Sequence, residues 1–187
     1  AMGLAGLGPV SAQQQPCATD ALHAAVMAGR PQVAHTQHQH EQRLRLVLDH
    51  DAGFARGGGL ITVPVVVHVV HDGGSENLPD ATVIAGIAQL NDAFANAGPS
   101  FDPDGHDMGI QFCLAQRDPQ GSATTGIEHI QSPLTDVVAE TQDAPLKLLS
   151  HWDPLSYINL YVVREITSTS VGSAVAGYAF LPGMHGQ

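Results

Sequence analysis

The hydrophobic pattern divides the chain into a largely polar amino-terminal part and a longer part in which apolar runs alternate with turns. The longest apolar run spans residues 60–71 and reads LITVPVVVHVVH. A strand with one solvated face alternates apolar and polar residues, whereas a strand covered on both faces is apolar nearly throughout and rich in Val and Ile. The run therefore predicts a buried central strand, around which the rest of the domain packs.

A helix is predicted after this strand, over residues 81–97, with Asp80 as its N-cap. Its apolar positions recur at i, i+4, i+7 and i+11, and they are Val83, Ile87, Leu90 and Phe94. This spacing places them on one helix face, which is the face that packs on a core.

The remaining pattern predicts further strands separated by turns. We expect strands over 108–116, 125–130, 157–163 and 176–181, a short helix over 144–150, and loops over 99–107 and 167–173. A strand, a crossover helix and another strand indicate an α/β sheet with the helix on one face. The expected fold class is α/β (α+β), with a mixed twisted sheet and one long packing helix.

The amino-terminal part predicts two helices, over residues 20–29 and 41–54, separated by the polar segment 31–40. Glycines 57–59 then break the chain before the long strand. Because this part carries little apolar sequence of its own, we treat residues 13–59 as a helical amino-terminal extension and linker that precede the core domain.

The first residues are small and apolar, and Val10-Ser11-Ala12 has the small-x-small form of a signal-peptidase site. We therefore interpret residues 1–12 as the remnant of a secretory signal. Ala1-Met2-Gly3 is equally typical of a cloning remnant. The core domain is assigned to residues 60–187.

Composition and charge argue against two classes of partner. The chain has 187 residues, of which 43% are hydrophobic, and a formal net charge of −11 with only seven Lys and Arg. No basic patch is available to meet phosphates, which argues against nucleic acid and against an anionic membrane surface. No apolar run approaches the roughly 20 residues of a membrane helix.

Histidines are abundant, and the segment HTQHQHE brings His35, His38, His40 and Glu41 close together. Imidazole is a common zinc ligand, so a His-rich metal-binding protein is one alternative for the chain. The surrounding Gln/His composition is that of a solvated tract. Leu44 stands where the motif H-E-x-x-H requires its second histidine.

Two other groups of metal-ligand residues are interpreted as structural. His68 and His71 lie three apart in a strand and face opposite sides, so we expect a satisfied core histidine and a turn histidine. Asp102, Asp104 and Asp107 resemble part of a calcium loop, but no Glu follows at the twelfth position. This excludes an EF-hand and favours a solvated turn.

Cys17 is the more informative of the two cysteines, because it lies in the amino-terminal extension, just after the interpreted signal remnant. A thiolate is a strong zinc ligand and can fill the open position of a catalytic zinc. A disulfide with Cys113 and an idle thiol are equal alternatives on the sequence alone.

Five segments of the core resemble, in this order, the pappalysin family of metzincin zinc metallopeptidases. They are VPVVVHVVHD (63–72), ENLPDATVIAGIAQLNDAF (76–94), IQFCLAQRDPQGSATTGI (110–127), HWDPLSYINLYVV (151–163) and GYAFLPG (177–183). The resemblance implies that residues 13–59 are a pro-segment and linker and that residues 60–187 form a metzincin-like amino-terminal, or upper, subdomain. Secreted bacterial members carry a C-G-T motif whose cysteine is a latency switch. Cys17-Ala18-Thr19 stands at that place, with Ala18 where the family has a glycine that permits close backbone approach.

The resemblance implies a secreted or periplasmic zinc metalloendopeptidase that acts on a protein or peptide, with calcium as a second candidate cofactor. The family's zinc motif, H-E-x-x-H-x-x-G-x-x-H, is absent from the 187 residues. We therefore assign no catalytic residue, give neither His151 nor His185 a ligand role, and expect the chain alone to be inactive. A non-catalytic binding module of the same fold is the other alternative.

Overall fold

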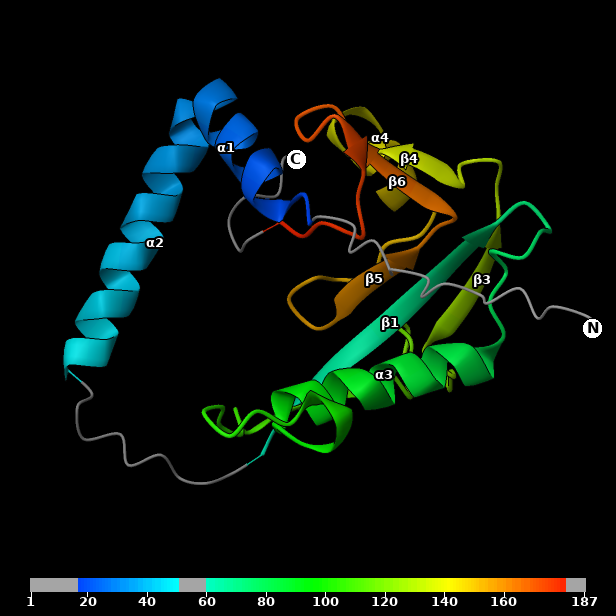
Figure 1. Cartoon of the computed structure of the whole chain (residues 1–187), viewed down its shortest axis with the longest axis horizontal. Coiled ribbons are helices and arrows are strands. Elements are labelled where there is room, and N and C mark those ends of the chain that lie inside the picture. The colour runs from blue at the N-terminus through cyan, green and yellow to red at the C-terminus, as the bar shows by residue number, and fades with distance from the viewer. Residues whose placement is uncertain (1–16, 51–59, 181–187) are drawn as a thin grey trace, which may run out of the picture.

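The computed structural model describes residues 17–50 and 60–180, and its centre is a four-stranded sheet (Figure 1). The sheet contains β1 (Ile61–His71), β2 (Ile110–Leu114), β3 (Ile127–Gln131) and β5 (Ile158–Val162). β2, β3 and β5 each pair with β1 in parallel. β2 pairs with the first half of β1 and β3 with its second half, so these two strands lie end to end along one edge. β5 pairs with the middle of β1 along the other edge.

Residues 65–70 of β1 are buried on both faces of the sheet, as predicted, whereas Leu60 and Ile61 at the start of the run are exposed. Val65, Val67 and Val69 pack with Val83 of α3 (Asp80–Phe94) on one face. The intervening residues face the opposite layer, where Val66 packs with Trp152, and Val70 packs with Val137 and Leu146. The predicted α/β class and the long packing helix on one face are confirmed.

The second layer is a small sheet that the sequence pattern did not predict. It consists of β4 (Asp136–Val138), β6 (Glu165–Ser168) and β7 (Ser173–Ala174), with β4 and β6 parallel and β6 and β7 antiparallel. The loop predicted over 167–173 is therefore wrong at its ends. The strand predicted over 176–181 is also wrong, because only Gly177 forms a bridge there, to Cys17. Residue 181 lies outside the described residues.

Two helices precede the sheet, and Figure 1 shows the second one lying apart from it. They are α1 (Thr19–Gly29) and α2 (Pro31–His50). The first agrees with the prediction, whereas α2 begins ten residues before the predicted 41–54, whose last four residues lie outside the described residues. The polar segment 31–40 is helical because Gln is a good helix former and proline is well tolerated in the first helical turn.

The other elements agree in kind but differ at their ends. Pro79 occupies the N-cap position of α3, and Asp80 is the first residue of the helix. No side chain caps this end of the helix, so the prediction of Asp80 as the N-cap is wrong. α4 (Ala139–Lys147) begins five residues before the predicted helix, and Pro145 lies inside it. A short 3₁₀ helix, η1 (Gly98–Ser100), follows α3.

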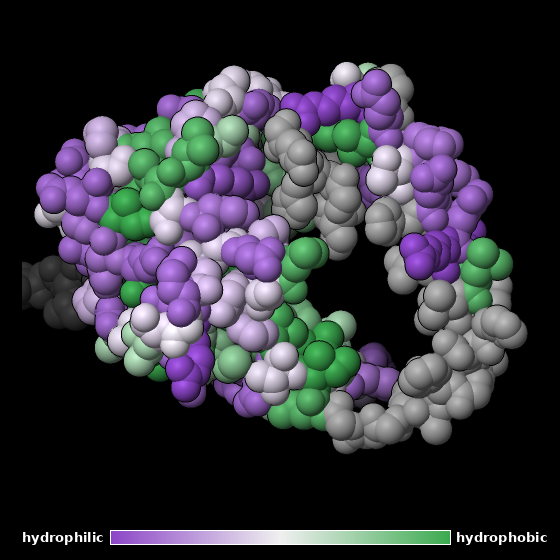
Figure 2. All heavy atoms as spheres, turned by 180° about the vertical axis from the view of Figure 1, so that it is seen from behind, coloured by the Kyte–Doolittle hydropathy of each residue, from purple (hydrophilic) through white to green (hydrophobic). Residues whose placement is uncertain are grey.

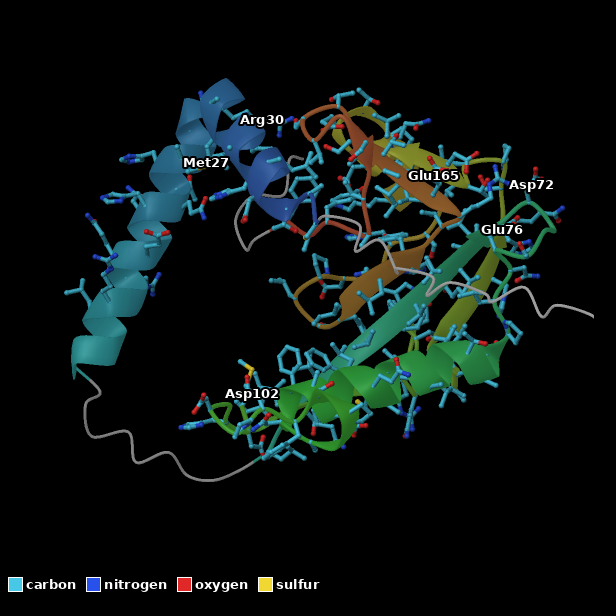
Figure 3. The ribbon with its side chains drawn as sticks, in the orientation of Figure 1. Met27, Arg30, Asp72, Glu76, Asp102 and Glu165 are labelled. Atoms are coloured by element: carbon cyan, nitrogen blue, oxygen red, sulfur yellow. The ribbon has the colours of Figure 1, made fainter. Side chains whose placement is uncertain are left out.

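A carboxylate holds the turn that follows β1, where Figure 3 labels Asp72 and Glu76. The Glu76 side chain is nearly buried and accepts hydrogen bonds from the main-chain N–H groups of Asp72 at 2.7 Å and Gly74 at 3.1 Å. These bonds outweigh burial and lower the pKa of Glu76. The turn is therefore tied to the sheet at neutral pH.

Gly126 directly precedes β3, one of the two strands that pair with the same edge of β1. Its φ is +72°, and a Cβ added there would lie 2.6 Å from the main-chain nitrogen of Ala115. Its carbonyl accepts a hydrogen bond from the N–H of Val67 at 2.9 Å. Only glycine fits this place, because both the conformation and the backbone contact exclude a side chain.

Replacing Gly126 with alanine is expected to lower the free energy of unfolding by about 3 kcal/mol, since strain and a backbone clash add. Gly73→Ala is the matched control: its φ is +83°, but nothing lies within 4 Å of an added Cβ. It should cost about 1 kcal/mol. Urea unfolding measures both. Equal losses would show that the contact with Ala115 is unimportant.

Several large apolar side chains remain exposed on the core. Leu155 is 95% exposed and Leu148 is 85% exposed, and Phe101 and Met108 are also exposed. Figure 2 shows apolar atoms along the side of the core that faces α2. Among the described residues, no helix is long and apolar enough to cross a membrane.

Candidate functional site

The amino-terminal helix docks on the small sheet and on the last described segment of the chain. Ala18 and Leu22 are 0% and 2% exposed, and they are buried in one cluster with Ala139 and Val175. Partly buried Ile166, Val171 and Tyr178 complete this cluster. The apolar contact explains why so short a helix, which is marginal alone, is held in place.

Main-chain hydrogen bonds fix the residues around Cys17 against the segment 177–179. Cys17 forms a parallel bridge with Gly177, and the N–H of Ala18 donates to the Gly177 carbonyl at 3.0 Å. The N–H of Ala179 donates to Oγ1 of Thr19 at 3.0 Å. The sequence Cys17-Ala18-Thr19 is therefore held at both its backbone and its threonine side chain.

The thiol of Cys17 is exposed, and its S–H donates to Oγ1 of Thr19 at 3.2 Å. Cys113 is also a free thiol, so the two cysteines are not joined by a disulfide. Ala18 has φ −91° and ψ −1°, which an L-residue adopts without strain, and its methyl group is fully buried. Alanine is thus accommodated where the resembling family has glycine.

A half-open, mainly apolar groove of about 900 Å³ lies between α1 and α4. Leu22 and Val26 line one side, and Ala144 and Leu148 line the other. The ammonium of Lys147 lies 4.5 Å from the ring centre of Phe180, which also lines the groove. The groove marks the boundary between the amino-terminal helix and the core.

Polar contacts support the core side of this groove. Asp143 pairs with Lys147 at 2.8 Å and accepts the hydroxyl hydrogen bond of Tyr178 at 3.0 Å. Burial, and then the carboxylate of Asp143, raise the pKa of Tyr178. The phenol therefore stays protonated and keeps donating to Asp143.

Glu140 anchors the loop between β6 and β7 to the start of α4. Its carboxylate accepts hydrogen bonds from the hydroxyl of Ser168 at 2.6 Å and from the N–H groups of Ser170 at 3.0 Å and Thr169 at 3.1 Å. Partial burial acts to raise the pKa, but these bonds outweigh it and lower the pKa of Glu140 to about 2.

We expect the ionised Glu140 to stabilise the fold above pH 4.5, the ordinary value for Glu, and this contribution to vanish as the pH falls to about 2. Glu140→Gln should therefore be less stable than the wild type at pH 7, and the two should converge near pH 2. Urea unfolding at several pH values measures the difference. A difference independent of pH would contradict the role given to the carboxylate.

The histidine-rich tract lies on α2, where two of its histidines bind glutamines. His35 is 2.9 Å from the amide nitrogen of Gln39, and His38 is 2.9 Å from that of Gln42. Nothing is described for the side chain of His40, and His185 lies outside the described residues. The tract therefore shows solvated side chains with local partners.

Metal-ligand side chains do not gather in the part of the chain that the structure describes. Among the side chains described there, no three His, Cys, Asp or Glu residues are arranged to hold a metal ion. The loop aspartates bond to nearby main chain, with Asp102 accepting from the N–H of Asp104 at 2.9 Å and Asp107 from the N–H of Gly109 at 2.8 Å. The described residues therefore do not fit a zinc or calcium site by themselves.

The two strand histidines have the separate roles that their spacing predicted. His68 is fully buried and bonds to Glu128 and Asn159, whereas His71 accepts the N–H of Gly73 in the turn. Sequence reasoning did not identify Glu128 or Asn159. Glu128 and Asn159 lie in two different strands, and nothing in the local sequence of either strand indicates that both bind His68.

Comparison with known proteins relates the fold of this chain to solved structures. No family model matches the chain. No curated protein matches it either. A solved structure of a Tannerella forsythia promirolysin mutant is similar over 90% of this chain and 55% of that one, with 25% identity and a TM-score of 0.66.

The chain has a metzincin-like fold. Mature mirolysin from Tannerella forsythia, in complex with a cleaved peptide, is 31% identical over 55% of this chain and 42% of that one, with a TM-score of 0.47. The chain thus spans about half the length of these solved structures. The similarity to promirolysin supports a metallopeptidase-like fold for the chain.

Proposed function

We propose that this chain is the amino-terminal part of a secreted, zinc-dependent metalloendopeptidase of the pappalysin type, made as a zymogen. Residues 13–59 act as the pro-segment, and residues 60–187 act as the upper subdomain of the catalytic domain. The observation that carries the proposal is the similarity to promirolysin, because coverage of 90% is more than the core domain alone supplies. A protein or peptide is the substrate.

In this proposal, zinc and its catalytic ligands belong to sequence beyond this chain, since the described residues do not fit a metal site. The exposed apolar side chains of the core, such as Leu155, support a further subdomain that covers them. The chain on its own has no peptidase activity. Cleavage of a protein substrate by the purified chain, stopped by a chelator, would refute this.

Cys17 is proposed as the latency switch of the zymogen. Its exposed thiol supplies a single zinc ligand, and the bonds of Ala18 and Thr19 to the segment 177–179 support its fixed position. The switch keeps the peptidase inactive until the pro-segment is removed.

The test is the full-length zymogen carrying Cys17→Ala. We expect it to cleave a peptide substrate without prior removal of the pro-segment, at least tenfold faster than the wild-type zymogen, because one metal-ligand bond is lost. Cys113→Ala is the matched control and should stay latent. If Cys17→Ala is as latent as the wild type, the switch assignment is wrong.

A non-catalytic binding module of the same fold is the competing proposal. Reading the gene beyond Gln187 separates the two. The motif H-E-x-x-H in that sequence supports the peptidase, and a stop codon directly after Gln187 supports the module.

A further inference from the structure

A cluster of polar side chains, buried at its centre and partly exposed around it, lies on the face of the sheet that carries the small second layer. Its centre is the ring of His68 on β1, which is 0% exposed and stacks on Tyr161 of β5 with ring centres 4.6 Å apart. Nδ1 of His68 lies 2.8 Å from Oε2 of Glu128, and Nε2 lies 2.9 Å from Oδ1 of Asn159. Both ring nitrogens therefore face an oxygen.

The orientation of the Asn159 amide is fixed by main-chain groups. The N–H of Trp152 donates to Oδ1 of Asn159 at 2.8 Å, and Nδ2 of Asn159 donates to the Trp152 carbonyl at 2.9 Å. An exchange of the amide oxygen and nitrogen would break both bonds. The oxygen therefore faces His68, and Nε2 of His68 must carry a proton to bond to it.

The carboxylate of Glu128 receives two further donors. The hydroxyl of Ser150 donates at 2.6 Å, and the indole N–H of Trp152 donates at 3.0 Å. Burial acts to raise the pKa of Glu128, but hydrogen bonds from Ser150, Trp152 and His68 outweigh it, and the pKa is lowered. Glu128 is thus ionised at neutral pH and can only accept, so Nδ1 of His68 must also carry a proton.

We propose that His68 is held as a doubly protonated imidazolium, and that its pair with Glu128, whose side chain is 31% exposed, is an acid-sensitive lock that fastens the segment Ser150–Trp152 to the central sheet. Both partners of the pair lie on adjacent parallel strands, which are rigid parts of the fold. The segment that they hold joins α4 to β5 and has no strand or helix of its own.

The groups around His68 come from two strands and from the held segment. β3 contributes Glu128, β5 contributes Asn159 and Tyr161, and the segment contributes Ser150, His151 and Trp152. Tyr161 donates to the Ser150 carbonyl at 2.8 Å, and burial, then Asp143 and Glu128, raise its pKa. Tyr161 therefore stays protonated, and Glu128 is the group whose charge changes on acidification.

The direction of the pH effect follows from the charge of Glu128. Its pKa is lower in the fold than the ordinary 4.5, so the bonds of the carboxylate persist as the pH falls through 4.5 and are lost below it. Protonation of Glu128 removes one acceptor site of its carboxylate. The donors of His68, Ser150 and Trp152 then compete for the acceptor sites that remain. The segment is then released, and with it one lining residue of the groove beside α1, since His151 lines that groove.

The experiment uses the whole chain labelled with ¹⁵N-histidine and ¹⁵N-tryptophan. At pH 7 we expect one ring with the nitrogen shifts of an imidazolium, and this signal should be absent from His68→Gln. In Glu128→Gln the new amide nitrogen can donate to both Ser150 and His68, so the contacts persist and the His68 ring becomes neutral. A neutral His68 ring in the wild type at pH 7 would overturn the proposal.

Trp152 is the only tryptophan of the chain, so its fluorescence reports the lock directly. We expect a change in emission below pH 4.5 in the wild type that is absent from Glu128→Gln. His129→Gln is the matched control, because His129 pairs with Asp80 at the same 2.8 Å but is exposed, and it should behave like the wild type. An identical acid transition in wild type and Glu128→Gln would refute the acid-sensitive release.

Discussion

Replacing Leu22 with aspartate is expected to release α1 from the core while the central sheet stays folded. Leu22 is 2% exposed and packs with Ala139 and Val175, in a cluster that contains no residue of β1. The substitution removes a buried leucine and places a carboxylate in an apolar site without a partner. The lost packing and the buried charge together cost about 4 kcal/mol. This exceeds the stabilisation by the few main-chain hydrogen bonds of residues 17–19.

Amide hydrogen exchange measures this release. A loss of about 4 kcal/mol predicts exchange about 1000-fold faster over residues 17–29, with no change in β1. Ala24→Asp is the control, since Ala24 is exposed on the same helix and accepts a charge at little cost. Exchange that rises equally in both variants, or in β1 as well, would show that the apolar cluster does not carry the docking.

Replacing Glu128 with leucine is expected to lower the free energy of unfolding by about 3–5 kcal/mol, because it leaves a buried histidine and two donors without their acceptor. Glu128→Gln keeps the shape and the hydrogen bonds, so it should cost about 1 kcal/mol. Urea unfolding followed by circular dichroism measures both. If leucine were tolerated as well as glutamine, the network would contribute packing alone.

The sequence pattern predicted the parts of the fold that depend on local burial. The Val-rich run at 60–71 indicates a buried strand, because a strand covered on both faces has no polar alternation. The apolar stripe of α3 likewise indicates which face of the helix packs on the core. The small sheet escaped prediction because β4, β6 and β7 have three, four and two residues, too few to show a period. The early start of α2 escaped because its Gln/His composition resembles a solvated linker.

The two sites differ in how much the sequence revealed. Cys17 was identified from its motif, but its neighbour Gly177 lies 160 residues further on, and no local pattern links them. His68 was predicted to be a satisfied core histidine, and the structure confirms this. Its partners, 60 and 91 residues away, could not be named, because pairing among strands is decided by the fold and not by spacing.

The docking of α1 gives the proposed latency its physical basis. The burial of Ala18 and Leu22 holds Cys17 in one place, and a thiol held in one place is an effective ligand for a metal brought beside it. In this account the upper subdomain supplies the scaffold and the latency contact, and the remainder of the protein supplies the metal site.

The most direct test of the account is a peptidase assay on the full-length protein encoded by the gene, before and after removal of residues 13–59. The account predicts that removal of the pro-segment switches on cleavage of a protein substrate, that a chelator stops it, and that added zinc restores it. A full-length protein that folds, loses its pro-segment and still cleaves nothing in the presence of zinc would contradict it.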